Sequence, residues 1–213
     1  MQNLEEYLRI SGKLPGWIRG EEALGLAMTS FSLPAHPIIV QIGTFFGSAA
    51  ILIAGARRLS GTGKVHCVDP FDCSGDDFSV PHYRRLLIEA GGGPLREHFE
   101  RNIRCAGLED WIEIHQGRAE EVARGWTAPI DMLTLGGDQS PAGARAAYEN
   151  WHPFLKPGGI IAIHNSDPRE YAATHDGNRH IVVEEIIPPA YTDIRLVVHT
   201  TFARRSVSPA SRA

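Results

Sequence analysis

The chain has 213 residues, 43% hydrophobic and 22% charged, which are the proportions of an ordinary globular protein with one well-filled α/β domain. A net charge of −4 gives no basic surface for nucleic acid, and no apolar run approaches the roughly 20 residues that cross a bilayer. The first ten residues lack the apolar segment of a secretory signal, so we expect a cytoplasmic protein without nucleic-acid or membrane partners.

Two helices are predicted first, over 3–11 and 20–31, with a stop at Pro34, so residues 1–35 are expected to form a helical cap. Beyond this cap, β-branched strands alternate with helices. The expected elements are strands at 38–42, 64–69, 111–117, 130–136 and 158–165, and helices at 47–59, about 81–106, 119–125 and 142–155. This alternation is typical of a parallel sheet covered on both faces, which predicts a Rossmann-like doubly wound domain over 36–205.

The pattern changes near the C-terminus. A helix is expected over 179–189, then one or two closing strands within 193–205 and a disordered tail at 206–213. The three cysteines are odd in number and lack metal-ligand spacing, so a disulfide framework is not expected. Cys67 lies within a predicted strand and should be a buried, small apolar residue.

Two glycines, Gly43 and Gly47, separate the first strand of the domain from its helix. Their G-x-x-x-G spacing differs from the G-x-G-x-x-G of dinucleotide-binding folds and argues against a nicotinamide or flavin site. Glycine permits a tight turn, and it also lets a ligand lie against the backbone. Ligands of doubly wound sheets bind at the carboxyl ends of strands where strand order reverses, which favours a binding loop over a turn alone.

Polar residues follow the next two strands. Asp69 ends the second strand, where a carboxylate can accept hydrogen bonds from both hydroxyls of a ribose, although an acid at this place can also cap a helix. Gly117, Arg118 and Ala119 follow the third strand, where backbone groups could meet the edge of an adenine ring.

Five blocks in order, VQIGTFFGSAAILIA, GKVHCVDPFD, IEIHQGRAEEVA, PIDMLTLGGDQS and WHPFLKPGGIIAIHN, resemble the class I S-adenosylmethionine-dependent methyltransferases. Within that family the chain is most similar to small-molecule O-methyltransferases of bacterial natural-product and sugar pathways, over residues 16–205. The resemblance implies a seven-stranded sheet with one antiparallel strand, S-adenosylmethionine across the ends of the first two strands, and a small-molecule acceptor. Whether the protein is a homodimer stays open.

The resemblance also implies roles for single residues. Asp69 would bind the ribose, and Arg118 and Ala119 would contact the edge of the adenine ring. The remaining residues expected around the cofactor are Gln41, Gly43, Thr44, Phe45, Gly47, Ser48, Gly117 and Gly136. The loop after the second strand offers the acceptor-side candidates Asp72, His82 and Tyr83, although loop residues of this kind often only pack or face solvent.

The chain departs from the family at three motifs. Gln41 replaces a glutamate, Gly136–Gln139 replaces Asp-Gly-Asp-His, and Asn165 replaces the aspartate of His-Asp. Magnesium prefers anionic oxygen ligands, and two carboxylates are missing here, so no metal is expected unless Asp138 or Asp167 compensates. Gln139 cannot replace a histidine base, which leaves His164 as the best-placed proton acceptor; the expected catalytic residues are His164, Asp138 and Gln139.

We therefore expect a metal-independent methyltransferase that acts on a hydroxyl, less readily an amine, of a small secondary metabolite. An S-adenosylmethionine-binding protein that has lost methyl transfer is the alternative, because both carboxylates and the histidine are absent. A nicotinamide dehydrogenase fits the fold but not the glycine spacing.

Overall fold

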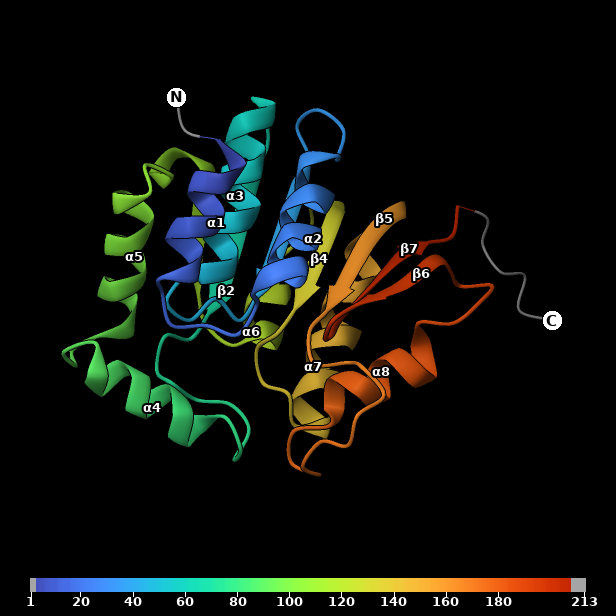
Figure 1. Ribbon diagram of the computed structural model, residues 1–213. Helices are drawn as coiled ribbons and strands as arrows, with labels where there is room; N and C mark the ends of the chain where they lie inside the picture. The colour runs from blue at the N-terminus through green and yellow to red at the C-terminus, as the bar shows by residue number, and fades with distance from the viewer. Residues whose placement is uncertain (1–2, 208–213) are drawn as a thin grey trace.

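A mixed sheet forms the centre of the protein in the computed structural model, which describes residues 3–207 (Figure 1). Its seven strands lie in the order β3-β2-β1-β4-β5-β7-β6. They are β1 Ile38–Ile42, β2 Lys64–Asp69, β3 Ile112–Gln116, β4 Ile130–Leu135, β5 Leu155–Ile163, β6 Tyr191–Val197 and β7 Thr200–Arg205. Strands β1 to β5 pair in parallel, and β7 runs antiparallel to both β5 and β6. The predicted Rossmann-like sheet with one antiparallel strand is confirmed.

Helices cover both faces of this sheet (Figure 1). They are α1 Leu4–Gly12, α2 Gly20–Phe31, α3 Ser48–Ser60, α4 Val80–Glu89, α5 Leu95–Cys105, α6 Ala119–Ala123, α7 Pro141–Trp151 and α8 Gly177–Glu185, with short 3-10 turns at Glu109–Trp111 and His152–Phe154. None of the described helices is long and apolar enough to cross a membrane.

Two hydrophobic cores result, because successive strand residues point to opposite faces. Along β1, Ile39 belongs to the core beneath α1, α2, α3 and α5, whereas Val40 belongs to the core beneath α6, α7 and α8. Cys67 is fully buried in the first of these cores, as predicted. Both faces are therefore filled, and the carboxyl ends of the strands remain as the place where a ligand can reach the sheet.

The N-terminal helices pack directly on α3. A Cβ at Gly55 of α3 would lie 2.4 Å from the ring of Tyr7 in α1, so only glycine permits this approach. The buried guanidinium of Arg57 donates 2.6 and 2.8 Å hydrogen bonds to the carbonyl groups of Ser30 and Thr62. These contacts hold α1 and the end of α2 against α3. The domain boundary expected near residue 35 stays a prediction.

Element boundaries differ from the prediction near the C-terminus. The helix expected to reach residue 155 ends at Trp151 and continues only as the 3-10 turn His152–Phe154, because Pro153 has no N–H to extend the α-helical hydrogen bonds. Strand β5 accordingly begins at Leu155 instead of 158. The helix expected to reach residue 189 ends at Glu185, before Pro188. Both predicted closing strands form, and residues 208–213 of the predicted tail lie outside the described part of the chain.

Candidate functional site

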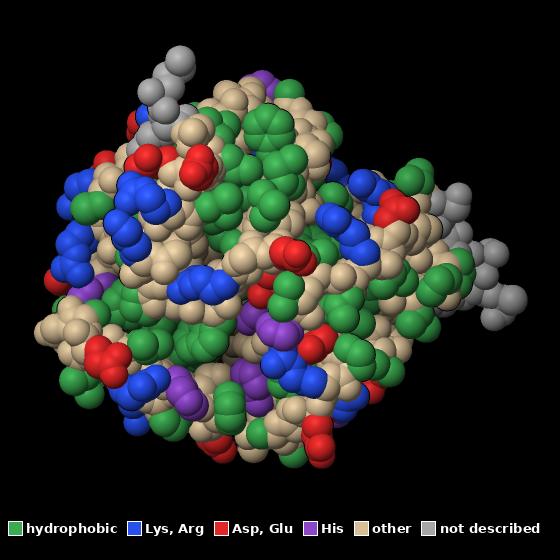
Figure 2. Space-filling model, in the orientation of Figure 1, with side chains coloured by type: hydrophobic (Ala, Val, Ile, Leu, Met, Phe, Trp, Pro, Cys, Tyr) green, Lys and Arg blue, Asp and Glu red, His purple; other side chains and the backbone are tan. Residues whose placement is uncertain are grey.

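A cavity of about 860 Å³ opens at the carboxyl ends of the five parallel strands β1 to β5. Its walls include the segment before α2 and the five loops that follow these strands. Strand order reverses between β1 and β4, so the cavity lies at the switch point where doubly wound sheets bind ligands. Figure 2 shows histidine side chains gathered around the hollow in this face, where His82, His164 and His175 line the cavity.

The two glycines of the β1–α3 loop have different structural causes. Gly43 has φ +80°, and a Cβ there would lie 2.4 Å from the Cα of Gly137, so the crossing of two loops requires glycine. Gly47 has φ +90° at the start of α3, and a Cβ there would lie 3.1 Å from the Phe99 ring. Gly43 lines the cavity and Gly47 does not. The loop is therefore both a tight turn and an open wall of the cavity.

Asp69 holds this loop in place. Its Oδ2 accepts hydrogen bonds from the backbone N–H groups of Thr44 at 2.7 Å and Phe45 at 3.0 Å, and its Oδ1 accepts one from Phe71 at 2.7 Å. Burial raises the pKa of Asp69, against the lowering effect of these three hydrogen bonds. A carboxylate has about four acceptor positions. Three are taken by these N–H groups, and the Thr44 hydroxyl lies 3.5 Å from Oδ2 at the fourth, a distance so long that one ligand hydroxyl can replace it. The sequence predicted contacts with two ribose hydroxyls.

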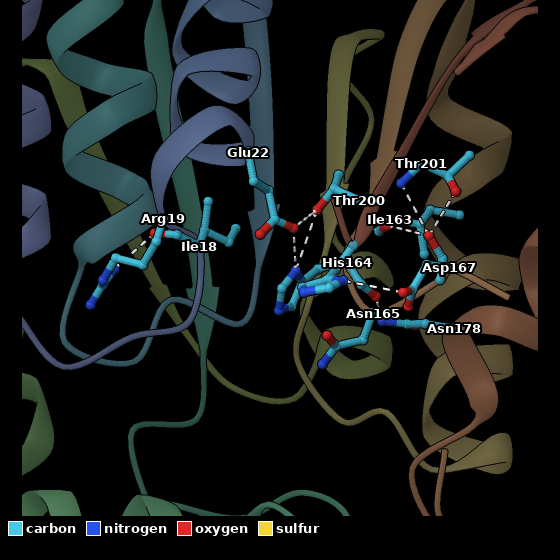
Figure 3. A network of polar contacts seen from close by, with 12 residues as sticks. Ile18, Arg19, Glu22, Ile163, His164, Asn165, Asp167, Asn178, Thr200 and Thr201 are labelled. Atoms are coloured by element: carbon cyan, nitrogen blue, oxygen red, sulfur yellow. Dashed lines mark hydrogen bonds and ion pairs between the residues drawn. The ribbon is translucent and has the colours of Figure 1, made fainter. Parts of the chain in front are cut away.

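His164 is fixed by a buried carboxylate that the sequence analysis did not identify. Its Nδ1 lies 2.9 Å from Oε1 of Glu22 on α2 and 3.3 Å from Oγ1 of Thr200 on β7 (Figure 3). The Thr200 hydroxyl also donates to Glu22, which is 2% exposed. An ionised carboxylate only accepts hydrogen bonds, so with Glu22 ionised a neutral imidazole would carry its proton on Nδ1 and its lone pair on Nε2. The arrangement suits a proton acceptor.

Several buried polar atoms beside the cavity have no hydrogen-bond partner among the described residues. They include Oε1 of Gln41, Oγ1 of Thr134 and Nε2 of His164. Gln41 and Thr134 are paired neighbours on β1 and β4, and His164 directly follows β5, so the three lie along adjacent strand ends. Buried polar groups in folded proteins are normally partnered. A polar ligand or a water molecule in the cavity would supply hydrogen-bond partners for these atoms.

A second histidine–carboxylate pair closes the other side of the cavity. His175 Nδ1 lies 3.0 Å from Oδ1 of Asp76, and its Nε2 lies 3.2 Å from the side-chain nitrogen of Asn165. Burial would raise the pKa of Asp76, but hydrogen bonds from His175 and Ser79 outweigh it, and the pKa is lowered. The pair joins the β2–α4 loop to the β5–α8 loop. In the sequence, Asp76 and His175 lie in two loops far apart in the chain, and no local pattern indicated that they meet.

Most of the residues predicted from the sequence line this cavity. These are Gln41, Gly43, Thr44, Phe45, Ser48, Asp69, His82, Tyr83, Gly117, Arg118, Ala119, Gly136, Asp138, Gln139 and His164. Gly47 and Asp72 do not line the cavity. The Asp72 carboxylate is exposed and accepts a 2.8 Å hydrogen bond from the backbone N–H of Ser74. Sequence patterns placed Asp72 in the right loop, but could not show which way its side chain turns.

Aromatic side chains form the wall opposite the strand ends. Tyr83 packs 5.4 Å from the ring of Trp17 and 5.0 Å from that of Phe45, measured between centroids. Burial raises the pKa of Tyr83 to about 12, so its hydroxyl stays protonated near neutral pH. Phe78 and His175 pack with ring centroids 4.8 Å apart at the far side. The cavity thus combines apolar walls with a few polar groups.

The residues at the family's metal position do not suit magnesium. A Cβ at Gly136 would meet nothing closer than 3.8 Å, so there is room for the carboxylate that this chain lacks. Asp138 accepts a hydrogen bond from the Ser140 backbone, and Asp167, paired with Arg169 at 2.8 Å, does not line the cavity. Asn165 offers one neutral amide oxygen. Magnesium sites usually include carboxylates, and this chain has Gly136 and Asn165 at two positions where the resemblance implies them.

Comparison with known sequences and structures identifies the family. A family described as a methyltransferase domain matches residues 40–166, which is more than half of the chain and runs from the middle of β1 to just beyond β5. The chain belongs to this methyltransferase family. The matched range ends just after His164, and therefore includes the strand ends that form one side of the cavity.

Solved methyltransferase structures share the fold at low sequence identity. Cofactor-bound Rv0187 from MTB is 15% identical, with a TM-score of 0.67 and coverage of 97% of this chain and 90% of that chain. The O-methyltransferase TomG from Streptomyces achromogenes, involved in tomaymycin synthesis and solved with SAM, is 19% identical, with a TM-score of 0.62 and coverage of 97% and 91%. An O-methyltransferase from Bacillus cereus, in complex with SAH, is 18% identical, with a TM-score of 0.62 and coverage of 97% and 92%.

Proposed function

We propose that this methyltransferase uses S-adenosylmethionine to methylate a hydroxyl of a small secondary metabolite, with His164 as the base and without a metal ion. The observation that carries the proposal is the environment of His164. One ring nitrogen is held by Glu22, and the other is unpartnered among the described residues, beside the glycine loop. Two structural relatives, TomG and the Bacillus cereus enzyme, are O-methyltransferases solved with SAM and SAH, which supports this donor and acceptor type.

The donor site lies along the ends of β1 and β2. Gly43, Thr44, Phe45 and Ser48 offer an open backbone wall for the methionine part, and the unpartnered oxygen of Gln41 can accept a hydrogen bond from its ammonium group. The remaining acceptor position of Asp69 suits a single ribose hydroxyl. Gly117, Arg118 and Ala119 lie at the end of β3, where they would contact the edge of the adenine ring.

When bound, S-adenosylmethionine supplies a methyl group on a positively charged sulfur, which an oxygen can attack in line. His164 Nε2 takes the proton of the acceptor hydroxyl as the new carbon–oxygen bond forms, and the electron pair of the broken carbon–sulfur bond stays on sulfur. Glu22 stabilises the imidazolium through Nδ1–H. The protein otherwise positions two reactants and excludes water, which supplies much of the acceleration.

The acceptor end of the cavity favours a flat, partly apolar molecule. Trp17, Phe45 and Tyr83 form one wall, and Phe78 and His175 another. Aromatic walls bind planar groups, and a few polar side chains fix orientation. Because TomG is involved in tomaymycin synthesis, it supports an acceptor from natural-product metabolism.

Two measurements test the proposal. Calorimetric titration should show binding of S-adenosylmethionine and no binding of NAD. Binding of NAD without binding of S-adenosylmethionine would contradict the proposal and indicate a dehydrogenase. A panel of phenols, sugars and amines incubated with labelled donor should then yield a methylated hydroxyl compound. Donor binding without transfer to any compound favours the second candidate, a binding protein that has lost methyl transfer, which the replacement of the histidine base by Gln139 supports.

A further inference from the structure

Three potential metal ligands meet away from the cavity, on the edge of the sheet. His66 lies on β2, and Glu113 and His115 lie two residues apart on β3, so both side chains of β3 share the face of their strand. In the strand register His66 is directly opposite Glu113. His66 Nδ1 lies 3.0 Å from His115 Nε2, and the Glu113 carboxylate oxygens lie 3.8 Å from the former and 3.6 Å from the latter.

We propose that His66, Glu113 and His115 bind a zinc ion. Zinc takes histidine nitrogen at about 2.0–2.1 Å and carboxylate oxygen at about 2.0–2.2 Å in tetrahedral geometry, which places ligand atoms roughly 3.3 Å apart. The three observed separations bracket this value. Two imidazoles and a carboxylate are a donor set that zinc favours over magnesium or calcium, and the partly exposed cluster leaves the fourth position for water.

The metal-free cluster is already suited to binding. Two ring nitrogens 3.0 Å apart can share only one proton, so one of them presents a lone pair.

The ion would join the two strands that end at the donor site. Asp69 follows His66 by three positions, and Gly117 follows His115 by two; the Gly117 N–H donates a 3.1 Å hydrogen bond to the Asp69 carbonyl. None of the three ligands is among the described residues that line the cavity. A bound ion would therefore stabilise the β2–β3 edge of the fold and take no part in methyl transfer.

Trp126 provides a local signal for the test. Its ring centroid lies 4.9 Å from that of His66 and 5.7 Å from that of His115. Chelator-treated protein should bind one equivalent of zinc by calorimetry, and its melting temperature should rise. Cobalt should give the visible absorption of a tetrahedral site and quench Trp126 fluorescence, a change that Trp126→Phe removes.

Variants decide whether these residues are the ligands. His115→Gln and Glu113→Gln alter partly exposed side chains, and their folding can be checked by circular dichroism. Each should weaken zinc binding by more than about ten-fold, since losing even an outer-shell partner costs about 10–100-fold. His180→Gln, which changes an exposed histidine of α8, should bind as the parent does. Absence of zinc binding to the parent, or unchanged binding in both ligand variants, would overturn the proposal, and neither readout depends on methyl transfer.

Discussion

At the scale of single residues, the two nitrogens of the His164 ring meet different surroundings. Nδ1 contacts Glu22 and Thr200, and Nε2 has no partner in the described part of the chain. The backbone of His164 is held as well, because its carbonyl accepts a 2.8 Å hydrogen bond from Asn178. The ring is thus fixed in one orientation before any substrate binds, which is what a positioned base requires.

His164→Gln should lower turnover by about 10²–10⁴-fold, the usual contribution of a positioned base, because an amide cannot accept the proton. Donor affinity should change little, since the side chain keeps its hydrogen-bonding capacity. Single-turnover rates and calorimetric donor titration measure the two effects separately. Normal turnover in this variant would show that His164 only positions other groups and that the acceptor reacts without a protein base.

Glu22→Gln should lower kcat by roughly ten-fold with little change in KM, since the carboxylate stabilises a charge that forms on His164 only during reaction. Glu21→Gln alters the exposed neighbour on α2 and should behave as the parent does. Equal effects from the two variants would show that Glu22 does not act through His164.

Asp69→Asn should weaken binding of S-adenosylmethionine by roughly 10–100-fold. The amide NH₂ would face the N–H groups of Thr44 and Phe45, and hydrogen bonds to a charged group are worth about 1.5–3 kcal/mol each. Asp72→Asn is the matched control, because that carboxylate lies outside the cavity. Unchanged donor affinity in Asp69→Asn, measured by calorimetry, would refute the assignment of Asp69 to the donor site.

At the scale of elements, two long loops border the acceptor end of the cavity, and one buried pair joins them. Asp76 lies in the β2–α4 loop and His175 in the β5–α8 loop, 99 positions apart in the chain. Asp76 also accepts hydrogen bonds from the backbone N–H groups of Ser79 and Gln139. One carboxylate therefore contacts three of the loops that shape the site.

Asp76→Asn should lower the free energy of unfolding by about 1–3 kcal/mol near neutral pH, the value of a hydrogen bond to a charged group with its buried partner left unpaired. The folded pKa of Asp76 is lowered, so its stabilisation is present above the unfolded value of about 3.9 and is lost as pH falls through the folded value. The difference between parent and variant should thus shrink below about pH 4. Urea unfolding at several pH values measures it, with exposed Asp77→Asn as the control; a difference that is constant with pH would contradict the argument.

At the scale of the whole molecule, methyl transfer and metal binding are expected to be separate properties. Gly136 and Asn165 stand in the cavity where the resemblance implies magnesium-binding carboxylates, whereas the cluster proposed for zinc lies on the β2–β3 edge. Both proposed sites depend on strands β2 and β3 of the sheet. The proposed metal ligands lie in the middle of these strands, and the proposed donor-site residues lie at their ends.

Turnover at 25 °C should therefore survive treatment with EDTA, and added magnesium should not increase it. The melting temperature should fall on the same treatment if zinc was bound. Initial rates and thermal unfolding, measured on one sample before and after chelation, test both expectations. Loss of turnover that magnesium restores would show that Asp138 or Asn165 helps to build a catalytic metal site.

The sequence by itself determined the order of strands and helices along the chain, the class of fold, and most of the residues that line the cavity at the strand ends. Strands buried on both faces produce short apolar runs, and glycine after a strand marks a tight turn or an open backbone, so Ile38–Ile42 and Gly43 could be interpreted without coordinates. These signals are local: each depends on residues within one element or one turn.

Only the tertiary structure decided which polar groups meet. Glu22 lies 142 positions from His164, and no periodicity links a helix near the N-terminus to a strand end near residue 164. Asp76 and His175 are likewise far apart in the chain. Asp69 could be named from the sequence because it ends a strand, but the backbone groups that hydrogen-bond to its carboxylate could not. Contacts between side chains depend on packing across the whole sheet, and a single chain carries no local pattern for them.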